Sequence, residues 1–363
     1  MRPWFTCRED RALLVGELVL LVCFAGAGTC ACGLSSTRDR TKLVDGVEGH
    51  RVARVETGSV TSMCFSPDGQ ILAIGVDASG RQGVRNRGWS DVQPSSLVCL
   101  IDTRSGAVAR RIATRGYITS LSFSPNGAKL AALSHHKSVY LVNVGTGTVS
   151  STVDVSHRHA EAVLFAADKS LVVCGDKTDV WEPAWGAGAW VLDIETMKCT
   201  HALSPVHGQC TGGVFIPRRK GAALIWDDHV SLFDTSTWLE VSVFKLEGST
   251  SQAVSYDGGP NGQLVIGCDA GNIYFLDIAE ARADLVLTSR LYPLVAYAWK
   301  RRLLAVQKRV EHATLELYEV GSGGALRSLS TDVGTVGATA MCSKQGGDAL
   351  AVAFENGDIV SYR

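Results

Sequence analysis

A short pattern recurs along this chain at a nearly constant interval, and it limits the possible folds more than any other feature. Each copy places an apolar or aromatic residue before a polar one at the end of a short apolar run: Ile101-Asp102, Val142-Asn143, Leu192-Asp193, Phe233-Asp234, Leu276-Asp277, Tyr318-Glu319 and Tyr362-Arg363. From Asp102 onward, the successive spacings are 41, 50, 41, 43, 42 and 44 residues. A period of about 40–45 residues with several short strands per unit is typical of a β-propeller. Residues 50–363 have room for seven units.

Each period has the same internal order of four short strands. A first strand, such as 60–65 or 118–123, leads into a turn: Ser66-Pro67-Asp68-Gly69 or Ser124-Pro125-Asn126-Gly127. Proline presets φ in such turns, and glycine supplies the left-handed position. A second strand, a third strand ending in the recurring dipeptide and a more polar fourth strand follow, and the final Asp or Asn can hold the next turn. These short, β-branched runs predict an all-β protein with seven four-stranded antiparallel blades.

The two ends of the repeat region complement each other. Residues 50–57 form an orphan outer strand before the first full unit, whereas the last unit stops at Tyr362-Arg363, one strand short. Pairing of these two segments would close a ring. We therefore expect residues 50–363 to form one closed seven-bladed β-propeller.

Two first-strand segments carry a resemblance to a known family. Residues 60–73 (Val-Thr-Ser-Met-Cys-Phe-Ser-Pro-Asp-Gly-Gln-Ile-Leu-Ala) and 118–131 (Ile-Thr-Ser-Leu-Ser-Phe-Ser-Pro-Asn-Gly-Ala-Lys-Leu-Ala) resemble the start of a WD-repeat. None of the seven dipeptides is Trp-Asp, and no Gly-His precedes a first strand at the family's usual spacing. The chain is thus identified as a divergent WD-like propeller, in which the family's His–Ser/Thr–Trp–Asp hydrogen-bond chain is expected to be absent from most blades. Residues 264–277 and 354–362 also resemble quinoprotein-type propeller repeats.

The first 33 residues differ from the rest. Arg2, Arg8 and Arg11 precede an apolar run, 12–28, which leads into Cys30 and Cys32. A basic front, an apolar middle and small residues at the end are typical of a secretory signal, and the nearby cysteines favour a lipoprotein acylated at one of them. Residues 34–49 would then be a polar tether. An uncleaved membrane anchor is the alternative, since about 20 apolar residues span a bilayer; without a signal, the protein would be cytoplasmic.

Net charge and cysteine content exclude few functions, and they favour neither nucleic-acid binding nor a metal site. The formal net charge is −1, so bulk basicity does not argue for a nucleic-acid partner. Seven of the eleven cysteines follow residue 33, without C-x-x-C or zinc spacing. A disulfide between Cys199 and Cys210 is conceivable, but buried free thiols fit strand positions better.

The strand order assigns each connection to a face of the ring. Second-to-third and fourth-to-first connections share one face, and the two long insertions, 76–96 and 176–188, are both second-to-third connections. Aromatic residues and arginines anchor many protein interfaces. The candidate partner-binding residues on this face are Arg81, Arg85, Arg87, Trp89, Tyr117, Arg158, Trp181, Trp185 and Arg309. The competing interpretation is that the insertions are ordinary variable loops.

Chemical motifs are weak by comparison. Residues 218–220 (Arg-Arg-Lys) and 300–302 (Lys-Arg-Arg) are basic turns on the opposite face, where solvated turns are the simpler interpretation and anion binding the alternative. His157, His159 and His207 could meet at a metal, but exposed loop histidines are the simpler explanation. The sequence contains no nucleophile elbow, phosphate loop or zinc-protease motif, so we expect no cofactor, no metal and no enzyme activity.

Three functions remain open. The first is a monomeric, non-catalytic scaffold that presents the insertion-bearing face to a protein partner at the cell envelope, held to the membrane by its N-terminal lipid or anchor. The second is an assembly factor similar to the propeller lipoprotein of the outer-membrane barrel-assembly machinery. The third is a propeller enzyme, such as a quinone-dependent dehydrogenase, a hydrolase or a lyase.

Overall fold

A computed structural model describes most of the repeat region. The described residues are 34–35, 40–44, 47–78, 96–155, 160–175, 188–203, 208–246, 250–256, 263–268, 270–280, 282–288, 294–308, 314–321, 324–330 and 337–363. The chain separates into two compact units, Met1–Ala31 and Cys32–Arg363, and every described residue belongs to the second.

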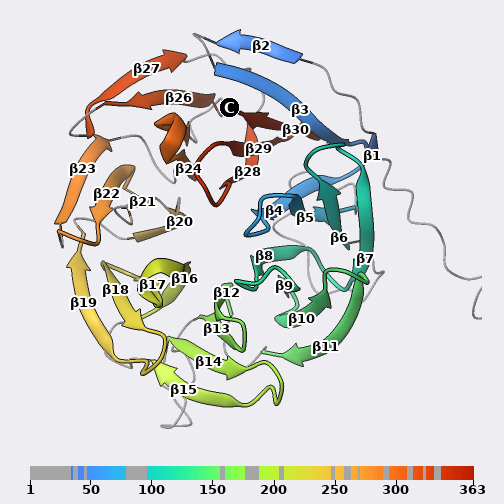
Figure 1. The fold of residues 1–363 in the computed structure, drawn as a ribbon, viewed down its shortest axis with the longest axis vertical. Coiled ribbons are helices and arrows are strands. Elements are labelled where there is room, and N and C mark those ends of the chain that lie inside the picture. The colour runs from blue at the N-terminus through green and yellow to red at the C-terminus, as the bar shows by residue number, and fades with distance from the viewer. Residues whose placement is uncertain are drawn as a thin grey trace, which may run out of the picture. The chain divides into compact units, whose positions relative to one another are not determined.

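The second unit is a seven-bladed β-propeller of antiparallel sheets (Figure 1). Blades 1 to 4 contain, in order, β4 (Ser59–Phe65), β5 (Ile71–Asp77), β6 (Ser96–Asp102), β7 (Val108–Thr114); β8 (Ile118–Phe123), β9 (Lys129–Ser134), β10 (Ser138–Asn143), β11 (Thr148–Asp154); β12 (Ala162–Ala167), β13 (Ser170–Cys174), β14 (Ala189–Asp193), β15 (Cys199–Leu203); and β16 (Cys210–Ile216), β17 (Gly221–Trp226), β18 (His229–Asp234), β19 (Glu240–Lys245). Blades 5 to 7 contain β20 (Thr250–Tyr256), β21 (Gln263–Cys268), β22 (Asn272–Asp277), β23 (Arg282–Thr288); β24 (Leu294–Ala298), β25 (Leu303–Lys308), β26 (Thr314–Val320), β27 (Leu326–Ser330); and β28 (Ala338–Ser343), β29 (Leu350–Phe354), β30 (Asp358–Tyr362).

The first strand of each blade lies innermost. Each contacts the first strand of the next blade, from β4 around to β28 and back to β4. The expected first, second and third strands agree with the observed ones to within about two residues at most ends. A fourth strand was expected in every blade, but that of blade 3, β15, was not located from the sequence, because residues 199–203 (Cys-Thr-His-Ala-Leu) lack a β-branched run.

The predicted closure of the ring is confirmed. β3 (Val47–Val55) pairs antiparallel with β30, from Gly49 opposite Tyr362 to Arg54 opposite Asp358. Two short strands, β1 (Leu34–Ser35) and β2 (Arg40–Val44), pair in turn with β3, so this sheet has six strands. β1, β2 and the start of β3 therefore lie within the segment expected to be a tether.

Every outer strand carries a one-residue bulge against its inner neighbour. The bulged residues, blade by blade, are Ala109, Ser150, Thr200, Val241, Val286, Leu329 and, in the closing strand, Val52. A bulge bends and twists a strand and discourages edge-to-edge pairing with another molecule. The bulge in β3 shows that the closing strand is equivalent to the fourth strand of the other blades.

A second one-residue bulge, which the sequence interpretation missed, occurs near the start of four first strands, and β20 has a two-residue irregularity at the same place. The bulged residue is a threonine after an apolar or small residue in each case: Thr61, Thr119, Thr211 and Thr339. Thr61 Oγ1 donates to the Ile118 carbonyl of the next blade at 2.6 Å. In the following blade, Ser122 Oγ accepts from Phe165 N at 2.9 Å. Hydroxyl groups of the first strands thus join neighbouring blades.

The recurring Asp holds the third-to-fourth turn, as expected. Asp102 Oδ1 accepts from Ser105 N at 2.7 Å, and Asp193 Oδ1 accepts from Thr196 N at 2.7 Å. Asp234 and Asp277 accept from the following backbone in the same way, and Asn143 takes this place in blade 2. The predicted glycine turns are also confirmed, because Gly69 and Gly127 have φ values of 67° and 72°.

These turns predict an acid dependence of stability. Hydrogen bonds from the turn lower the pKa values of Asp102, Asp193 and Asp234. A lowered folded-state pKa contributes stability above the unfolded pKa of about 3.9, and this contribution is lost as pH falls through the folded-state pKa. We expect the urea midpoint to fall below about pH 4, and to fall less in the triple variant Asp102→Asn, Asp193→Asn, Asp234→Asn. An identical acid profile for the two proteins would contradict this origin.

The core consists of clusters between neighbouring blades. One joins blades 3 and 4 and includes Leu164, Val191, Leu224 and Trp226, all nearly or fully buried. Of the cysteines that the structure describes, all seven are free, and Cys99, Cys174, Cys210 and Cys268 are buried. Buried thiols, the favoured interpretation, thus account for most of them, and Cys199 and Cys210 form no disulfide.

Candidate protein-interaction face

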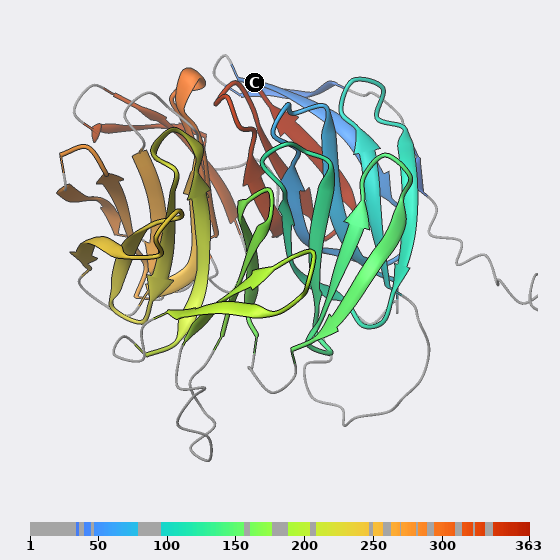
Figure 2. The same ribbon diagram turned by 60° about the horizontal axis from the view of Figure 1, so that its bottom comes forward.

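The strands of each blade run between two opposite faces of the propeller (Figure 2). We call the face with the second-to-third and fourth-to-first connections the insertion face, and the opposite one the turn face. Backbone contacts confirm that these two kinds of connection meet: His135 N, from a second-to-third connection, donates to the carbonyl of Tyr117, from a fourth-to-first connection, at 2.8 Å. At the closing blade, Val55 N donates to the Gly357 carbonyl at 2.8 Å.

Both long insertions begin and end on this face. In blade 1, Asp77 pairs with Ser96 across the base of the insertion. In blade 3, Gly175 N donates to the Gly188 carbonyl at 2.9 Å, and Cys210 N donates to the Gly175 carbonyl at 2.9 Å. A Cβ on Gly188 would lie 2.5 Å from the Gly208 carbonyl oxygen, so only glycine fits this base.

Most of the candidate partner-binding residues lie outside the described residues. They are Arg81, Arg85, Arg87, Trp89, Arg158, Trp181, Trp185 and Arg309. Cys30 and Cys32, the candidate lipidation sites, and His157, His159 and His207 also lie outside them. The bases of the insertions are placed, and Tyr117 is the candidate whose contacts the structure shows.

Tyr117 is part of an aromatic cluster on blade 2, midway between the two insertion bases. Its hydroxyl lies 2.8 Å from His135 Nδ1, and the two rings stack with centroids 4.5 Å apart. His136 follows at 6.0 Å from the His135 ring. Both histidines are exposed and Tyr117 is half-buried, so the cluster has ring surface on the outside of the protein. We call these three residues the Tyr117 cluster.

The surroundings of His135 disfavour its charged form. Partial burial, followed by the charges of Lys137 and His136, lowers the pKa of His135. Lys137 itself reaches blade 3, where Nζ donates to the Ala160 carbonyl at 2.6 Å and lies 3.5 Å from Glu161 Oε1. This bridge fixes blades 2 and 3 beside the second insertion. The sequence signal for the cluster is the adjacent pair His135-His136 in the second-to-third connection of blade 2.

Blade 4 places a second aromatic group behind the insertion of blade 3. Trp226 is fully buried, and its ring is nearly parallel to that of His229, with centroids 6.2 Å apart. His229 Nδ1 lies 2.6 Å from Asp228 Oδ1, and this contact lowers the pKa of Asp228. A Cβ on Gly188 would lie 2.6 Å from Trp226 Cζ3, so Trp226 supports the base of the insertion.

The turn face uses its cations mainly for structure. The basic turns contain two short 3-10 helices, η3 (Pro217–Arg219) and η4 (Trp299–Arg301). Arg219 Nη1 donates to the Ile278 carbonyl at 3.3 Å, and Arg302 Nε donates to the Val320 carbonyl at 2.6 Å. Arg219 and Arg302 thus have structural contacts, whereas the simpler expectation was that these turn residues are merely solvated.

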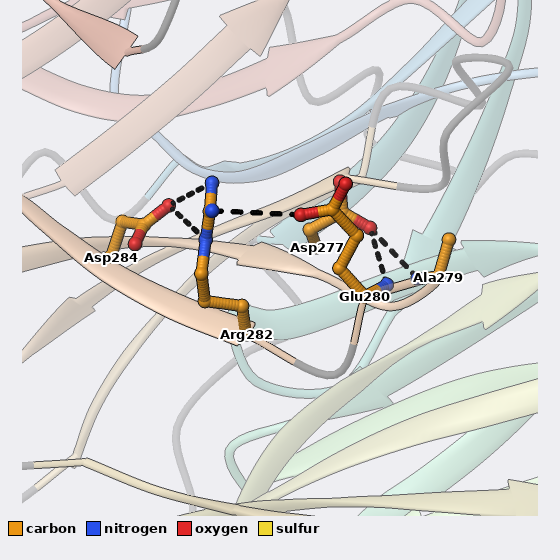
Figure 3. A network of polar contacts seen from close by, with 5 residues as sticks. All are labelled: Asp277, Ala279, Glu280, Arg282 and Asp284. Carbon is orange, nitrogen blue, oxygen red and sulfur yellow. Dashed lines mark hydrogen bonds and ion pairs between the residues drawn. The ribbon is translucent and has the colours of Figure 1, made fainter.

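Blade 5, between the two basic turns, carries its own charge network (Figure 3). Arg282 Nη2 lies 2.8 Å from Asp284 Oδ2, and Arg282 Nη1 lies 3.5 Å from Glu280 Oε2. Asp277 Oδ1 accepts from the backbone of Ala279 and Glu280. Because Arg282 is neutralised by two carboxylates, the turn face does not form a continuous cationic surface here.

Two absences hold for the part of the chain that the structure describes. Among them, no three His, Cys, Asp or Glu side chains are grouped as metal ligands would be. No helix in the described segments has the length and hydropathy needed to cross a bilayer.

Comparison with known proteins supports the fold. Residues 42–81 match the family "WD domain, G-beta repeat". The fold is similar to the WD40 repeats of RRP9 (TM-score 0.65, 13% identity, covering 90% of this chain and 99% of that one). It is also similar to the Cps50 (Swd1) propeller domain of Myceliophteria thermophila (0.64, 15%, 90% and 99%) and to hydrazine synthase of Kuenenia stuttgartiensis (0.62, 15%, 85% and 97%). The sequence has no significant match among curated proteins. The seven-bladed fold and the match over one repeat are consistent with a divergent WD-like β-propeller.

Proposed function

We propose that this divergent WD-like propeller is a non-catalytic scaffold that binds a protein partner at the cell envelope through its insertion face. The observation that carries the proposal is the Tyr117 cluster on blade 2, flanked by the bases of two long insertions on blades 1 and 3. Loops on a rigid scaffold are where binding most often resides. WD-repeat propellers, whose repeat model matches residues 42–81, commonly mediate protein interactions.

The rest of the molecule supplies rigidity rather than chemistry. The closed ring, the hydroxyl contacts between first strands and the Lys137 bridge fix blades 1 to 3 relative to one another. A preorganised face loses little conformational freedom on binding, which raises affinity. The envelope placement rests on the basic and apolar segment before residue 34, and the intact mass of membrane-extracted wild-type, Cys30→Ser and Cys32→Ser proteins tests it.

The Tyr117→Ala variant is expected to weaken partner binding about tenfold or more, as loss of a central aromatic residue typically does. The measurement is quantitative mass spectrometry of proteins crosslinked to the full-length chain in cells, followed by affinity measurement with the recovered partner. Replacing residues 177–187 with a Gly-Ser linker is expected to reduce the same partner's recovery.

The control is Arg301→Ala, an exposed position on the turn face. This variant should recover the partner as the wild type does. If the Tyr117→Ala and loop-replacement proteins keep their partners and Arg301→Ala loses them, the turn face is the interaction face and the proposal is wrong.

A further inference from the structure

The strands that precede the first full blade leave almost no free chain between the propeller and the candidate lipidation sites. Leu34 of β1 already pairs with Val55 of β3. Cys32 lies two residues before Leu34 and Cys30 four residues before it. At about 3.5 Å per extended residue, these cysteines lie at most about 7 Å and 14 Å along the chain from β1. An acyl group on Cys32 therefore holds this side of the propeller close to the bilayer surface.

The outer strands at this place form one side of the ring. β1 lies beside β7 on the outer circumference in both Figure 1 and Figure 2. Val55 of β3 is part of the apolar cluster between blades 7 and 1, and Val108 of β7 packs against the same cluster. We call β1, β2, β3 and β7 the closure wall. Because this wall runs between the insertion face and the turn face, a surface that contacts it leaves both faces open.

The closure wall is the positively charged part of the outer circumference. The outer strands of blades 2 to 6, β11, β15, β19, β23 and β27, have formal charges of −1, 0, 0, 0 and +1 with neutral histidine. Each of β2, β3 and β7 is net positive, and together they have a formal charge of +5. Their charged residues are Arg40, Lys42, Glu48, Arg51, Arg54, Arg110 and Arg111.

The two arginines of β7 are not neutralised by a described carboxylate. Arg110 donates to the Gly145 carbonyl at 3.0 Å, a contact with a neutral group that leaves its charge uncompensated. Arg111 is exposed, and its guanidinium forms neither a hydrogen bond nor an ion pair with any residue that the structure describes. The outer strands of blades 5 and 6 differ, because Arg282 pairs with two carboxylates and Arg327 pairs with one.

The closing strand adds to this positive charge. Arg51 Nη1 and Arg54 Nε lie 3.5 Å and 3.8 Å from the same oxygen, Asp358 Oδ1. One carboxylate therefore serves two cations. The side chain of Arg54 is 47% exposed, so it can contact a charged surface outside the ring.

We propose that the closure wall rests on the anionic headgroups of the membrane, with Arg54, Arg110 and Arg111 in contact with lipid phosphates. Each basic residue near an anionic bilayer strengthens the attraction about fivefold, and the planar fork of arginine matches a phosphate. A tether of about 7 Å keeps β1 within one Debye length of the headgroups, about 8 Å at physiological ionic strength. The ring then stands on its side, with the insertion face open to a partner. The inference rests on the envelope placement in the proposed function.

The test measures which arginines the bilayer shields. Full-length protein extracted from its native membrane is reconstituted with vesicles of phosphatidylcholine alone or of phosphatidylcholine mixed with phosphatidylglycerol. Phenylglyoxal modifies exposed guanidinium groups, and mass spectrometry gives the rate at each arginine. The anionic vesicles are expected to slow modification of Arg110 and Arg111 about threefold or more, because bound phosphates cover their guanidinium groups. Arg282, Arg301 and Arg327 are internal controls and are expected to keep their rates.

Double variants test whether docking depends on these charges. In the Arg110→Gln, Arg111→Gln protein, Arg54 is expected to lose its shielding on anionic vesicles, because the loss of two cations weakens the attraction about 25-fold. The charge-matched Arg282→Gln, Arg327→Gln protein should keep it. Arg111→Gln alone removes no contact of the guanidinium with a described residue, so a smaller loss in the same direction cannot come from altered folding.

The outcomes are separable. Equal rates at Arg110 and Arg111 on the two kinds of vesicle overturn the docking surface, and so does equal shielding of the three control arginines. Shielding by soluble glycerol phosphate as strong as that by vesicles also overturns it and indicates a site for a free anion. If shielding fails while Tyr117→Ala still loses the partner, the closure wall is wrong and partner binding by the insertion face stands. If shielding occurs and Tyr117→Ala keeps the partner, the insertion face is wrong and the membrane contact stands.

Discussion

A chain that starts at residue 58, without β1, β2 and β3, is expected to lose most of its stability and to self-associate. β3 contributes Ala53 and Val55, which are 1% and 2% exposed, to the cluster between blades 7 and 1. Its removal also opens the hydrogen-bonding edge of β30 and uncovers part of the core beside it. The loss is on the order of 5–15 kcal/mol, the whole stability of a typical domain.

The measurements are urea denaturation and size-exclusion chromatography of the truncated protein. A chain starting at residue 47 is the matched control: it lacks β1 and β2 but keeps β3, so we expect it to remain monomeric with a modestly lower urea midpoint. A synthetic peptide of residues 47–57 added to the shorter chain should restore the monomer, whereas a scrambled peptide should not. A chain from residue 58 that is monomeric and as stable as the wild type would show that β3 does not close the ring.

The closure of the ring could be predicted from sequence because it follows from the number of repeat units and the number of strands in each unit. The spacing of the dipeptides defined seven units, and the last unit, ending at Tyr362-Arg363, lacked a strand that residues 50–57 could provide. The third-strand Asp turns were predictable for a similar reason. An Asp side chain hydrogen-bonds the backbone two or three residues ahead. The turns after Asp102 and Asp193 can therefore be predicted from the local sequence alone.

Features that depend on contacts between blades could not be predicted in the same way. A threonine after an apolar residue, as at Thr61, is common in strands and does not by itself indicate a bulge. Only the position of the next blade shows that Thr61 Oγ1 has the Ile118 carbonyl as its acceptor. The stacking of Tyr117 on His135 joins two connections 18 residues apart. Local patterns carry no signal for either contact. The fourth strand of blade 3 was expected from the repeat, but the position of β15 was not located because its residues have little intrinsic preference for a strand.

The sequence therefore predicted which face of the propeller carries the candidate site, but not the contacts of individual residues on it. Topology placed both insertions and Tyr117 on one side of the ring, and the described backbone confirms this arrangement at the insertion bases.

The Trp226→Ala variant is expected to lower the free energy of unfolding by about 3–5 kcal/mol, the usual cost of truncating a fully buried large aromatic side chain. Trp226 is 0% exposed and belongs to the cluster between blades 3 and 4. Its ring also lies against Gly188. Truncation therefore removes the support beneath the insertion base as well as the volume that the indole ring fills. Urea denaturation measures the loss, and Trp226→Phe, which keeps an aromatic ring, should cost less than Trp226→Ala.

The matched control is Trp299→Ala on the turn face. Trp299 is half-buried, so its truncation should cost less than that of Trp226, about 1–2 kcal/mol, within the ordinary range for substitutions. Binding separates the two positions further. Because Trp226 supports the Gly175–Gly188 base, Trp226→Ala should also weaken partner binding under conditions where the protein remains folded, whereas Trp299→Ala should leave binding unchanged. Equal stability losses at the two positions, with binding intact in both, would mean that the base of the insertion is held by the backbone contacts of Gly175 alone.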